Sequence, residues 1–346
     1  MLNNKKTEMA ELPIYNNLEE KRKYFSNGEK ESFIIDTKTS LDKWFKDVQE
    51  EEKKETEIDA TAWIYRGMTE AKYKLLTSSQ RLWISNEMKQ WSNKSYVEFI
   101  SDLVNKANGN ALIKKVFELY NYSRSDREFP ILSLLQHYGA PTPLMDWTYN
   151  NNVAFFFATD GLKKKENPKE KIDDYFSVYR INKRKYKKEL LNIIDFIPGE
   201  LYPEIKSFKD FSDNNRNPKS NGIFYISDFE RKGESSGETK PYGNLIIRTK
   251  KPLTSIYNQN IIPQEGLFIF NPFSEKTLEE IFNTDFNKSG WNLALTPFDC
   301  FNIHKDLAEY LKRKIDVRFK INKGFIYPNL NDEAKKIKEI TVNGLI

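Results

Sequence analysis

The 346-residue sequence has few of the residues that common catalytic and metal sites need. Its single cysteine, Cys300, excludes an internal disulfide and a cysteine-based zinc site. The two histidines, His137 and His304, would leave a zinc ion dependent mostly on carboxylates, so we expect no metal. The glycine-rich phosphate loops GxGxxG and GxxxxGK[ST] and the GxSxG nucleophile motif are also absent.

Long apolar runs are missing as well. No segment approaches the roughly 18 apolar residues that span a bilayer, and the first residues lack the apolar region of a secretory signal. We therefore expect a cytoplasmic protein that does not contact a membrane. The net charge of +5, from 55 basic and 50 acidic residues, is too small to indicate nucleic-acid binding by itself.

Aromatic residues, by contrast, make up 14% of the chain and can build a large core from few side chains. Apolar spacing predicts helices at 41–48, 96–104, 151–159 and 303–311, and strands at 61–68, 175–181, 222–226, 244–248 and 266–270. The charge run 50–57 is interpreted as a solvated helix end. The pattern favours an α+β fold, with a helix-rich N-terminal half packed on a mixed or antiparallel sheet.

No linker rich in proline or glycine divides the chain, so we expect a single domain over residues 38–340. Residues 1–37 are polar and are predicted to form a flexible N-terminal arm, and residues 341–346 a C-terminal tail. Hydrophilic stretches near 163–172 and 207–220 are predicted to be surface insertions.

Polar residues inside apolar segments are the candidates for chemistry. Arg66 lies in an apolar strand, where an arginine usually grips a carboxylate or a phosphate. Asp146 has apolar neighbours and needs a partner, so an internal ion pair with Arg66 is the non-catalytic alternative. His137 is either a packed core residue or a functional one. Because buried polar groups need one another, we predict that these three residues and Thr148 converge on one pocket.

Several segments together resemble the FRG domain, a bacterial domain named for its (F/Y)RG motif. They are Tyr65–Arg66–Gly67, LTSSQR at 76–81, LQHYGAPT at 135–142, LMDWT at 144–148 and VAFFFA at 153–158. The segments 263–268 and 324–330 are similar to two later elements of the family, so the resemblance covers roughly residues 38–340. Pro143 stands where the family usually has arginine, and Asn151 where it usually has proline, so no role of that arginine carries over.

The order of these motifs is also similar to that of ADP-ribosyltransferases, which implies a sheet of that kind and NAD as the cofactor. In that fold an arginine grips NAD, and a late glutamate or glutamine holds the nicotinamide ribose. The similarity implies NAD binding by Tyr65, Arg66, Gly67, Trp147 and Thr148. It implies catalytic roles for Arg66, His137, Asp146, Gln264 and Glu265; of the last two we favour Gln264, because the family motif falls on it.

The resemblance implies an ADP-ribosyltransferase or NAD glycohydrolase that acts in bacterial anti-phage defence or in a toxin system. Its partners would be a macromolecular acceptor, protein or nucleic acid, and a phage-derived trigger or a neutralising partner. Two alternatives stay open. A nucleic-acid-binding or -modifying module would show a continuous basic face with exposed aromatic residues, and a sensor of a phage protein would have no catalytic cleft.

Overall fold

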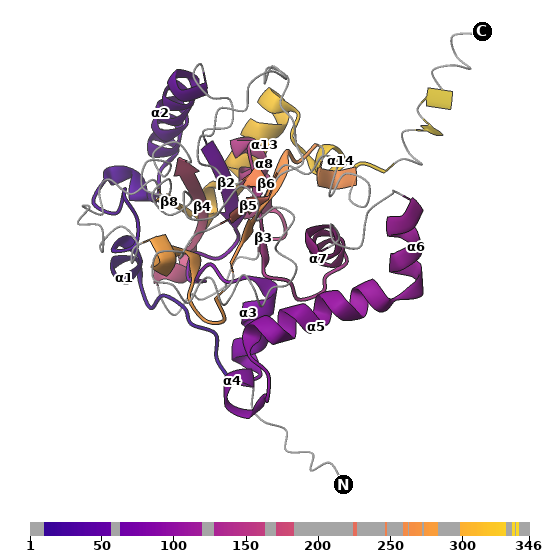
Figure 1. Ribbon diagram of the computed structural model, residues 1–346. Helices are drawn as coiled ribbons and strands as arrows, with labels where there is room; N and C mark the ends of the chain where they lie inside the picture. The colour runs from indigo at the N-terminus through magenta and orange to yellow at the C-terminus, as the bar shows by residue number, and fades with distance from the viewer. Residues whose placement is uncertain are drawn as a thin grey trace.

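The computed structural model describes residues 10–56, 63–119, 128–162, 171–182, 224–226, 246–247, 259–261, 263–271, 273–282, 298–329, 334–335 and 337–338. These residues form an eight-stranded sheet surrounded by helices (Figure 1). The strands are β1 (Ile34–Ile35), β2 (Trp63–Met68), β3 (Leu144–Thr148), β4 (Tyr175–Asn182), β5 (Phe224–Ile226), β6 (Ile246–Ile247), β7 (Gly266–Phe270) and β8 (Phe298–His304). Their order is β1-β8-β4-β2-β3-β7-β5-β6.

Neighbouring strands are antiparallel except at the two edges, where β1 runs parallel to β8 and β5 parallel to β6. The helices include α1 (Leu18–Arg22), α2 (Lys38–Thr56), α3 (Ser78–Ser85), α4 (Met88–Trp91), α5 (Tyr96–Gly109), α6 (Ala111–Leu119), α7 (Glu128–His137), α8 (Asn151–Thr159), α13 (Ala308–Phe319) and α14 (Lys323–Ile326). The predicted α+β class with a mixed sheet is confirmed. None of the helices in these segments is both long and apolar enough to cross a membrane.

One expected element differs. The helix predicted over 303–311 starts only at Ala308, and Ile303 belongs to strand β8. Strand β8 is buried on both faces along most of its length. A strand buried on both faces has a continuous apolar run instead of an alternation, which spacing alone does not distinguish from a buried helix.

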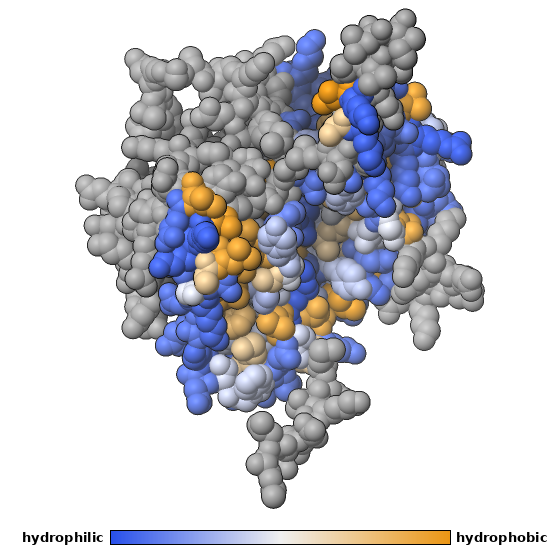
Figure 2. Space-filling view, turned by 90° about the vertical axis from the view of Figure 1, so that its right-hand side faces the viewer, coloured by the Kyte–Doolittle hydropathy of each residue, from blue (hydrophilic) through white to orange (hydrophobic). Residues whose placement is uncertain are grey.

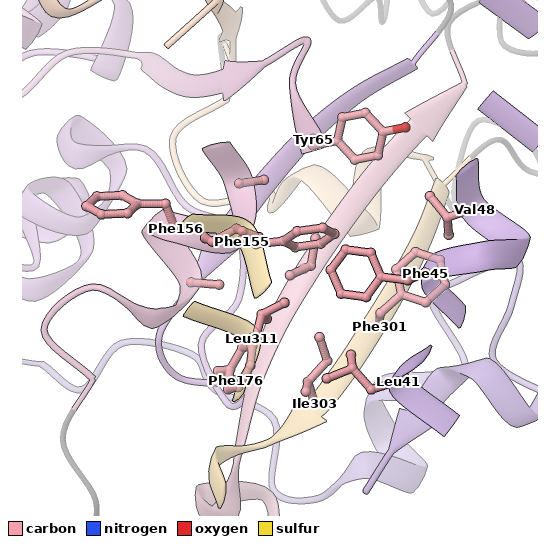
Figure 3. Close-up of a cluster of buried hydrophobic side chains, with 14 of the residues drawn as sticks. Leu41, Phe45, Val48, Tyr65, Phe155, Phe156, Phe176, Phe301, Ile303 and Leu311 are labelled. Atoms are coloured by element: carbon pink, nitrogen blue, oxygen red, sulfur yellow. The ribbon is translucent and has the colours of Figure 1, made fainter. Parts of the chain in front are cut away.

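Helices α2, α8 and α13 cover one half of one sheet face. Strand alternation directs Tyr65, Val178 and Phe301 to this face, since they pair or neighbour one another across β2, β4 and β8. Figure 3 shows the resulting cluster, in which Phe45 of α2 and Phe155 of α8 meet with ring centroids 5.0 Å apart. This core takes up part of the aromatic content of the chain, and the core on the opposite sheet face takes up another part.

Helix α8 lies directly on β2 because residue 67 is glycine. A Cβ atom at Gly67 would lie 1.9 Å from the carbonyl oxygen of Ala154 and 2.6 Å from the nitrogen of Ala158. Asn150 caps the helix by accepting a hydrogen bond from the backbone N–H of Asn152 at 3.0 Å. The cap and the glycine together set the start and the height of α8 over the sheet.

The second half of the same face, over β3 and β7, is covered by α3, α5, α6 and α7. Their buried side chains form a separate core with Leu144, Phe268 and Phe270. Figure 1 shows α5, α6 and α7 on the right of the sheet, with α2, α8 and α13 towards the top. Two groups of helices therefore lie side by side on one sheet face, and they meet at the boundary between β2 and β3.

The opposite sheet face is covered by the N-terminal segment, contrary to the predicted flexible arm. Tyr15, Phe25 and Phe33 are buried in the core there. Lys21 is fully buried, and its Nζ donates to the Ala71 carbonyl, Ser177 Oγ and Asn302 Oδ1 at 2.7, 2.7 and 2.9 Å. The prediction failed because this segment anchors through irregularly spaced aromatic residues in a polar background. Residues 1–9, the insertions at 163–170 and 207–220, and the tail at 341–346 lie outside the described residues.

The contact at Gly67 can be tested by adding one methyl group. Gly67→Ala should lower the free energy of unfolding by about 2–4 kcal/mol, because the clash is with backbone atoms that cannot rotate away. The matched control is Gly109→Ala at the end of α5, where a Cβ meets nothing within 4 Å. That variant should keep its stability or gain up to about 1 kcal/mol. Equal urea midpoints for the two variants would contradict the close approach of α8.

A buried carboxyl group makes stability depend on pH. Glu279 is fully buried and accepts hydrogen bonds from Tyr15 Oη at 2.8 Å and Leu75 N at 3.1 Å. Burial raises its pKa, so its contribution to stability is complete below the ordinary glutamate pKa, about 4.3. It is lost as the pH rises through the raised pKa. Urea unfolding between pH 5 and 8 should therefore show wild type losing stability relative to Glu279→Gln.

Relative to Glu279→Gln, the free energy of unfolding of wild type should fall by at most about 1.4 kcal/mol per pH unit. Glu31→Gln, at a side chain that is 97% exposed, is the control and should follow wild type. Parallel profiles for wild type and Glu279→Gln would show that Glu279 is ionised in the folded protein across this range.

Candidate functional site

The sheet is split between β2 and β3. Strand β2 pairs with β4 over its whole length, from Trp63 opposite Asn182 to Met68 opposite Ser177. Between β2 and β3, however, only Tyr65 and Thr148 are paired. Residues 66–68 of β2 and 145–147 of β3 therefore follow this pair without a ladder, a stretch that we call the β2–β3 split. Unpaired strand backbone needs other partners, so this is where a side chain or a ligand can enter the sheet.

Arg66 occupies the split. Its Nη1 donates a hydrogen bond to the backbone carbonyl of Asp146 on β3. Its Nε is buried and has no hydrogen-bond partner among the described residues. Burial lowers the pKa of the Arg66 guanidinium, and the nearby Asp146 carboxylate opposes that shift. The group stays charged because an arginine pKa is far above neutrality, so the split contains a cation with an unused donor.

A second arginine lies close by. Arg81 of α3 donates from Nη1 to the Leu76 carbonyl at 2.7 Å. Burial lowers its pKa, and Asp146 again opposes the shift. Arg81 in turn lowers the pKa of Arg66, because each guanidinium charge disfavours the other. Two cations thus share the field of one carboxylate, an arrangement that favours an additional anion.

Asp146 presents its carboxylate on the exposed surface beside α7. Gln136 Nε2 donates to Asp146 Oδ2 at 2.8 Å, and Thr142 Oγ1 donates to Gln136 Oε1. His137 is the next residue of α7; its burial lowers its pKa, and Asp146 opposes the shift. Arg66 and His137 therefore both lie in the field of Asp146, whereas Thr148, the fourth residue predicted for this pocket, donates to the Gln264 carbonyl. The shared pocket and the catalytic roles stay predictions.

A different buried arginine shows what a purely structural ion pair looks like in this protein. Arg180 of β4 donates from Nε to Asp299 Oδ2 at 2.9 Å and lies 2.7 Å from Glu51 through Nη2. These carboxylates raise its pKa above the ordinary value despite burial. Arg66 has a backbone carbonyl where Arg180 has two carboxylates. The internal Arg66–Asp146 ion pair that we considered from the sequence is replaced by a hydrogen bond to the Asp146 backbone.

Other predicted site residues serve the fold. Trp147 packs in the core of the opposite face, with its ring 6.2 Å from that of Phe298. Thr148 Oγ1 donates to the Gln264 carbonyl at 2.6 Å and accepts from Asn150 N at 2.9 Å. Gly67 makes room for α8. These three residues pack or bond within the fold beside the split, and Trp147 Nε1 is buried without a hydrogen-bond partner among the described residues.

Gln264 and Glu265 lie near Thr148, the last residue of β3. Gln264 Nε2 donates to the Ile326 carbonyl of α14 at 3.1 Å, which ties the start of β7 to α14. Glu265 adopts a left-handed backbone with φ of 46°, and its Oε1 accepts from Asn150 Nδ2 at 3.1 Å. Gly266 pairs with Thr148, two residues along β3 from Asp146. The rise of a strand places these two levels about 7 Å apart, within the length of one dinucleotide ligand.

Sequence reasoning missed Glu52. Its carboxylate accepts hydrogen bonds from Tyr65 Oη and from Asn151 Nδ2, the latter at 2.9 Å to Oε1, and burial raises its pKa. The charge run around it suggested a solvated helix end. The helical spacing, however, continues from Val48 to position 52, on the buried stripe of α2. Gln136 and Arg81 were also missed as site residues, although both lie in the quoted motif segments.

Residues 61–167 match the family model of the FRG domain. That range contains β2, β3 and the helices from α3 to α8, and therefore Arg66, Arg81, His137 and Asp146, but not Gln264 or Glu265. Searches of curated proteins and of solved structures found no match. In the described residues, no group of three or more histidine, cysteine or acidic side chains could hold a metal ion.

The difference between partly exposed Arg66 and buried Arg180 predicts effects of different size on stability. Arg66→Met should change the free energy of unfolding by no more than about 1 kcal/mol, because it removes one hydrogen bond and one poorly compensated charge. Arg180→Met should cost about 3–5 kcal/mol, because it strands the buried Asp299 carboxylate. Urea denaturation of both variants tests this. A loss at Arg66 as large as that at Arg180 would make Arg66 a structural residue.

Proposed function

We propose that this chain, which carries an FRG domain over residues 61–167, is a cytoplasmic NAD-consuming enzyme of the ADP-ribosyltransferase kind, an effector of anti-phage defence or of a toxin system. The observation that carries the proposal is the Arg66 guanidinium in the β2–β3 split, with a buried Nε that has no partner. A macromolecular acceptor and a phage-derived trigger or neutralising partner belong to the same proposal.

The charge arrangement supports a pyrophosphate-bearing substrate. A guanidinium presents planar donors that match phosphate oxygens, and the unused Nε of Arg66 is such a donor. Arg81 adds a second cation in the same field. Because two like charges disfavour each other, a ligand with two negative phosphates would relieve the repulsion and bind more strongly than a neutral one.

The carboxylates near the split support the proposed cleavage of NAD. Breaking the bond between nicotinamide and ribose builds positive charge on the sugar, and a fixed carboxylate stabilises that charge. Glu265, opposite Tyr149 and so about 10 Å along the sheet from the level of Asp146, is held by Asn150 and suits this role. Gln264 is less suited than the sequence suggested, because its amide already donates to Ile326.

Asp146 is suited to activating the acceptor. Gln136 fixes its carboxylate, and the carboxylate is exposed, so an incoming hydroxyl or water can reach it. A carboxylate that accepts the nucleophile's proton completes the transfer: the nucleophile bonds to the ribose carbon, and nicotinamide leaves with the electrons of the broken bond. His137, beside Asp146, can relay that proton to solvent.

The proposal is tested by calorimetry with NAD and by measuring nicotinamide release. Arg66→Met should weaken NAD binding about 10- to 150-fold, the value of one or more hydrogen bonds to a charged group. Glu265→Gln should keep binding and lower nicotinamide release by about 10²- to 10³-fold. Gln264→Ala should have a smaller effect than Glu265→Gln on release.

The matched control is Arg313→Met on the exposed surface of α13, which should behave as wild type. If wild type neither binds nor cleaves NAD at millimolar concentration, with or without a candidate acceptor, the enzyme proposal fails. Binding of a phage protein without turnover would then favour the sensor, and binding of oligonucleotides would favour the nucleic-acid module.

A further inference from the structure

Tyr138 is an exposed aromatic residue at a rigid position. Its side chain is 73% exposed, although an aromatic ring gains free energy from burial. It follows the last residue of α7, the helix whose Gln136 donates a hydrogen bond to Asp146. Figure 2 views the molecule from the side on which α6 and α7 lie and shows apolar surface next to hydrophilic surface there.

The backbone at Tyr138 is fixed by a helix C-cap. Ala140 N donates to the Leu135 carbonyl at 2.9 Å, and Gly139 N donates to the Gln136 carbonyl at 3.1 Å. Gly139 has a φ of 78°, the left-handed conformation that this cap requires. The ring is therefore displayed on a preorganised turn, so a ligand that contacts it pays little to order the chain.

His137 adds a second ring. The centroids of His137 and Tyr138 are 4.9 Å apart at an interplanar angle of 65°, an edge-to-face contact that orients the phenol. Burial lowers the pKa of His137, which favours the neutral imidazole at pH 7. Two adjacent uncharged rings on one turn are suited to a flat heteroaromatic group.

The position of the His137–Tyr138 ring pair relative to the charged groups decides which heteroaromatic ligand fits. Gln136, which holds the Asp146 carboxylate, directly precedes the ring pair on α7. Arg66 contacts the backbone of that same Asp146 from the split. His137, whose ring contacts Tyr138, lies in the field of the Asp146 carboxylate, as do Arg66 and Arg81. A nucleotide combines a planar base with anionic phosphates in one molecule.

We propose that Tyr138, oriented by His137, is the base-binding residue of this site and stacks on a nucleobase-type ring of a nucleotide whose phosphates reach Arg66. The inference rests on the proposed function and adds a specificity-determining residue to it. NAD carries two such rings, adenine and nicotinamide. ADP-ribose retains the first alone and nicotinamide mononucleotide the second alone, so these two ligands show which ring Tyr138 receives.

The test compares Tyr138→Ala and Tyr138→Phe with wild type by calorimetry. Tyr138→Ala should weaken binding of NAD and of one of the two single-ring ligands about 5- to 150-fold, the range for one base stacked on an aromatic side chain. Tyr138→Phe should restore binding, because stacking needs the ring and not the hydroxyl. Inorganic pyrophosphate should bind Tyr138→Ala as it binds wild type and should lose affinity in Arg66→Met.

Trp91→Ala is the matched control, since Trp91 is 64% exposed on α4, which Figure 1 shows well away from α7. It should bind all four ligands as wild type does. Unchanged affinity of Tyr138→Ala for NAD and both single-ring ligands, with Arg66→Met still impaired, would overturn the base-binding role and leave the proposed function standing. Wild-type protein that binds none of the four ligands would overturn both.

Discussion

The close contact between α8 and β2 at Gly67 is the constraint on which the site depends. The helix backbone rests on the strand with no side chain between them, so β2 cannot rotate or shift without a clash with Ala154. With β2 held in this way, strand alternation sends Tyr65 towards α2 and α8 and Arg66 to the other face. The arginine therefore enters the sheet where β2 has parted from β3.

Two arginines in neighbouring strands illustrate how differently one side chain can be used. Arg180 is buried among carboxylates, and its charge is neutralised inside the fold. Arg66 is partly exposed and receives a backbone carbonyl and the partial influence of Asp146, while Arg81 adds repulsion. Each has one buried nitrogen without a hydrogen-bond partner among the described residues, Nε of Arg66 and Nη1 of Arg180. The two arginines therefore differ in the compensation of their charge and not in an unused donor.

Residues of a sequence motif need not all touch a ligand. Gly67 and Thr148 both lie in the motifs that carry the family resemblance, yet one admits a helix and the other closes a turn against β7. Trp147 is buried in the core of the opposite face. Around these supports, Gln136 and Thr142 form a hydrogen-bonded chain that orients Asp146. A motif of this kind combines a few reactive groups with the residues that hold them in place.

Local sequence pattern determined the elements whose burial is one-sided and periodic. The short apolar strands β2, β4 and β7 were predicted close to their observed bounds, and the stripes of α2 and α5 were found although both helices extend beyond the predicted ranges. The convergence of Arg66, His137 and Asp146 also followed from the sequence, because polar groups in apolar segments require partners. The N-terminal segment and β8 were missed, since neither shows a clean period.

Tertiary structure alone decided which partner each polar group received. Tyr15 finds Glu279 across 264 positions of sequence, and Lys21 finds Asn302 across 281. Glu52 accepts a hydrogen bond from Tyr65 because α2 packs over β2. The charge of Arg81 acts on Arg66 because α3 lies beside the split. Periodicity reports whether a residue faces the core, but not which distant segment it meets there. That pairing is set by how the helices and strands pack, and it gave Arg180 two carboxylates but Arg66 a backbone carbonyl.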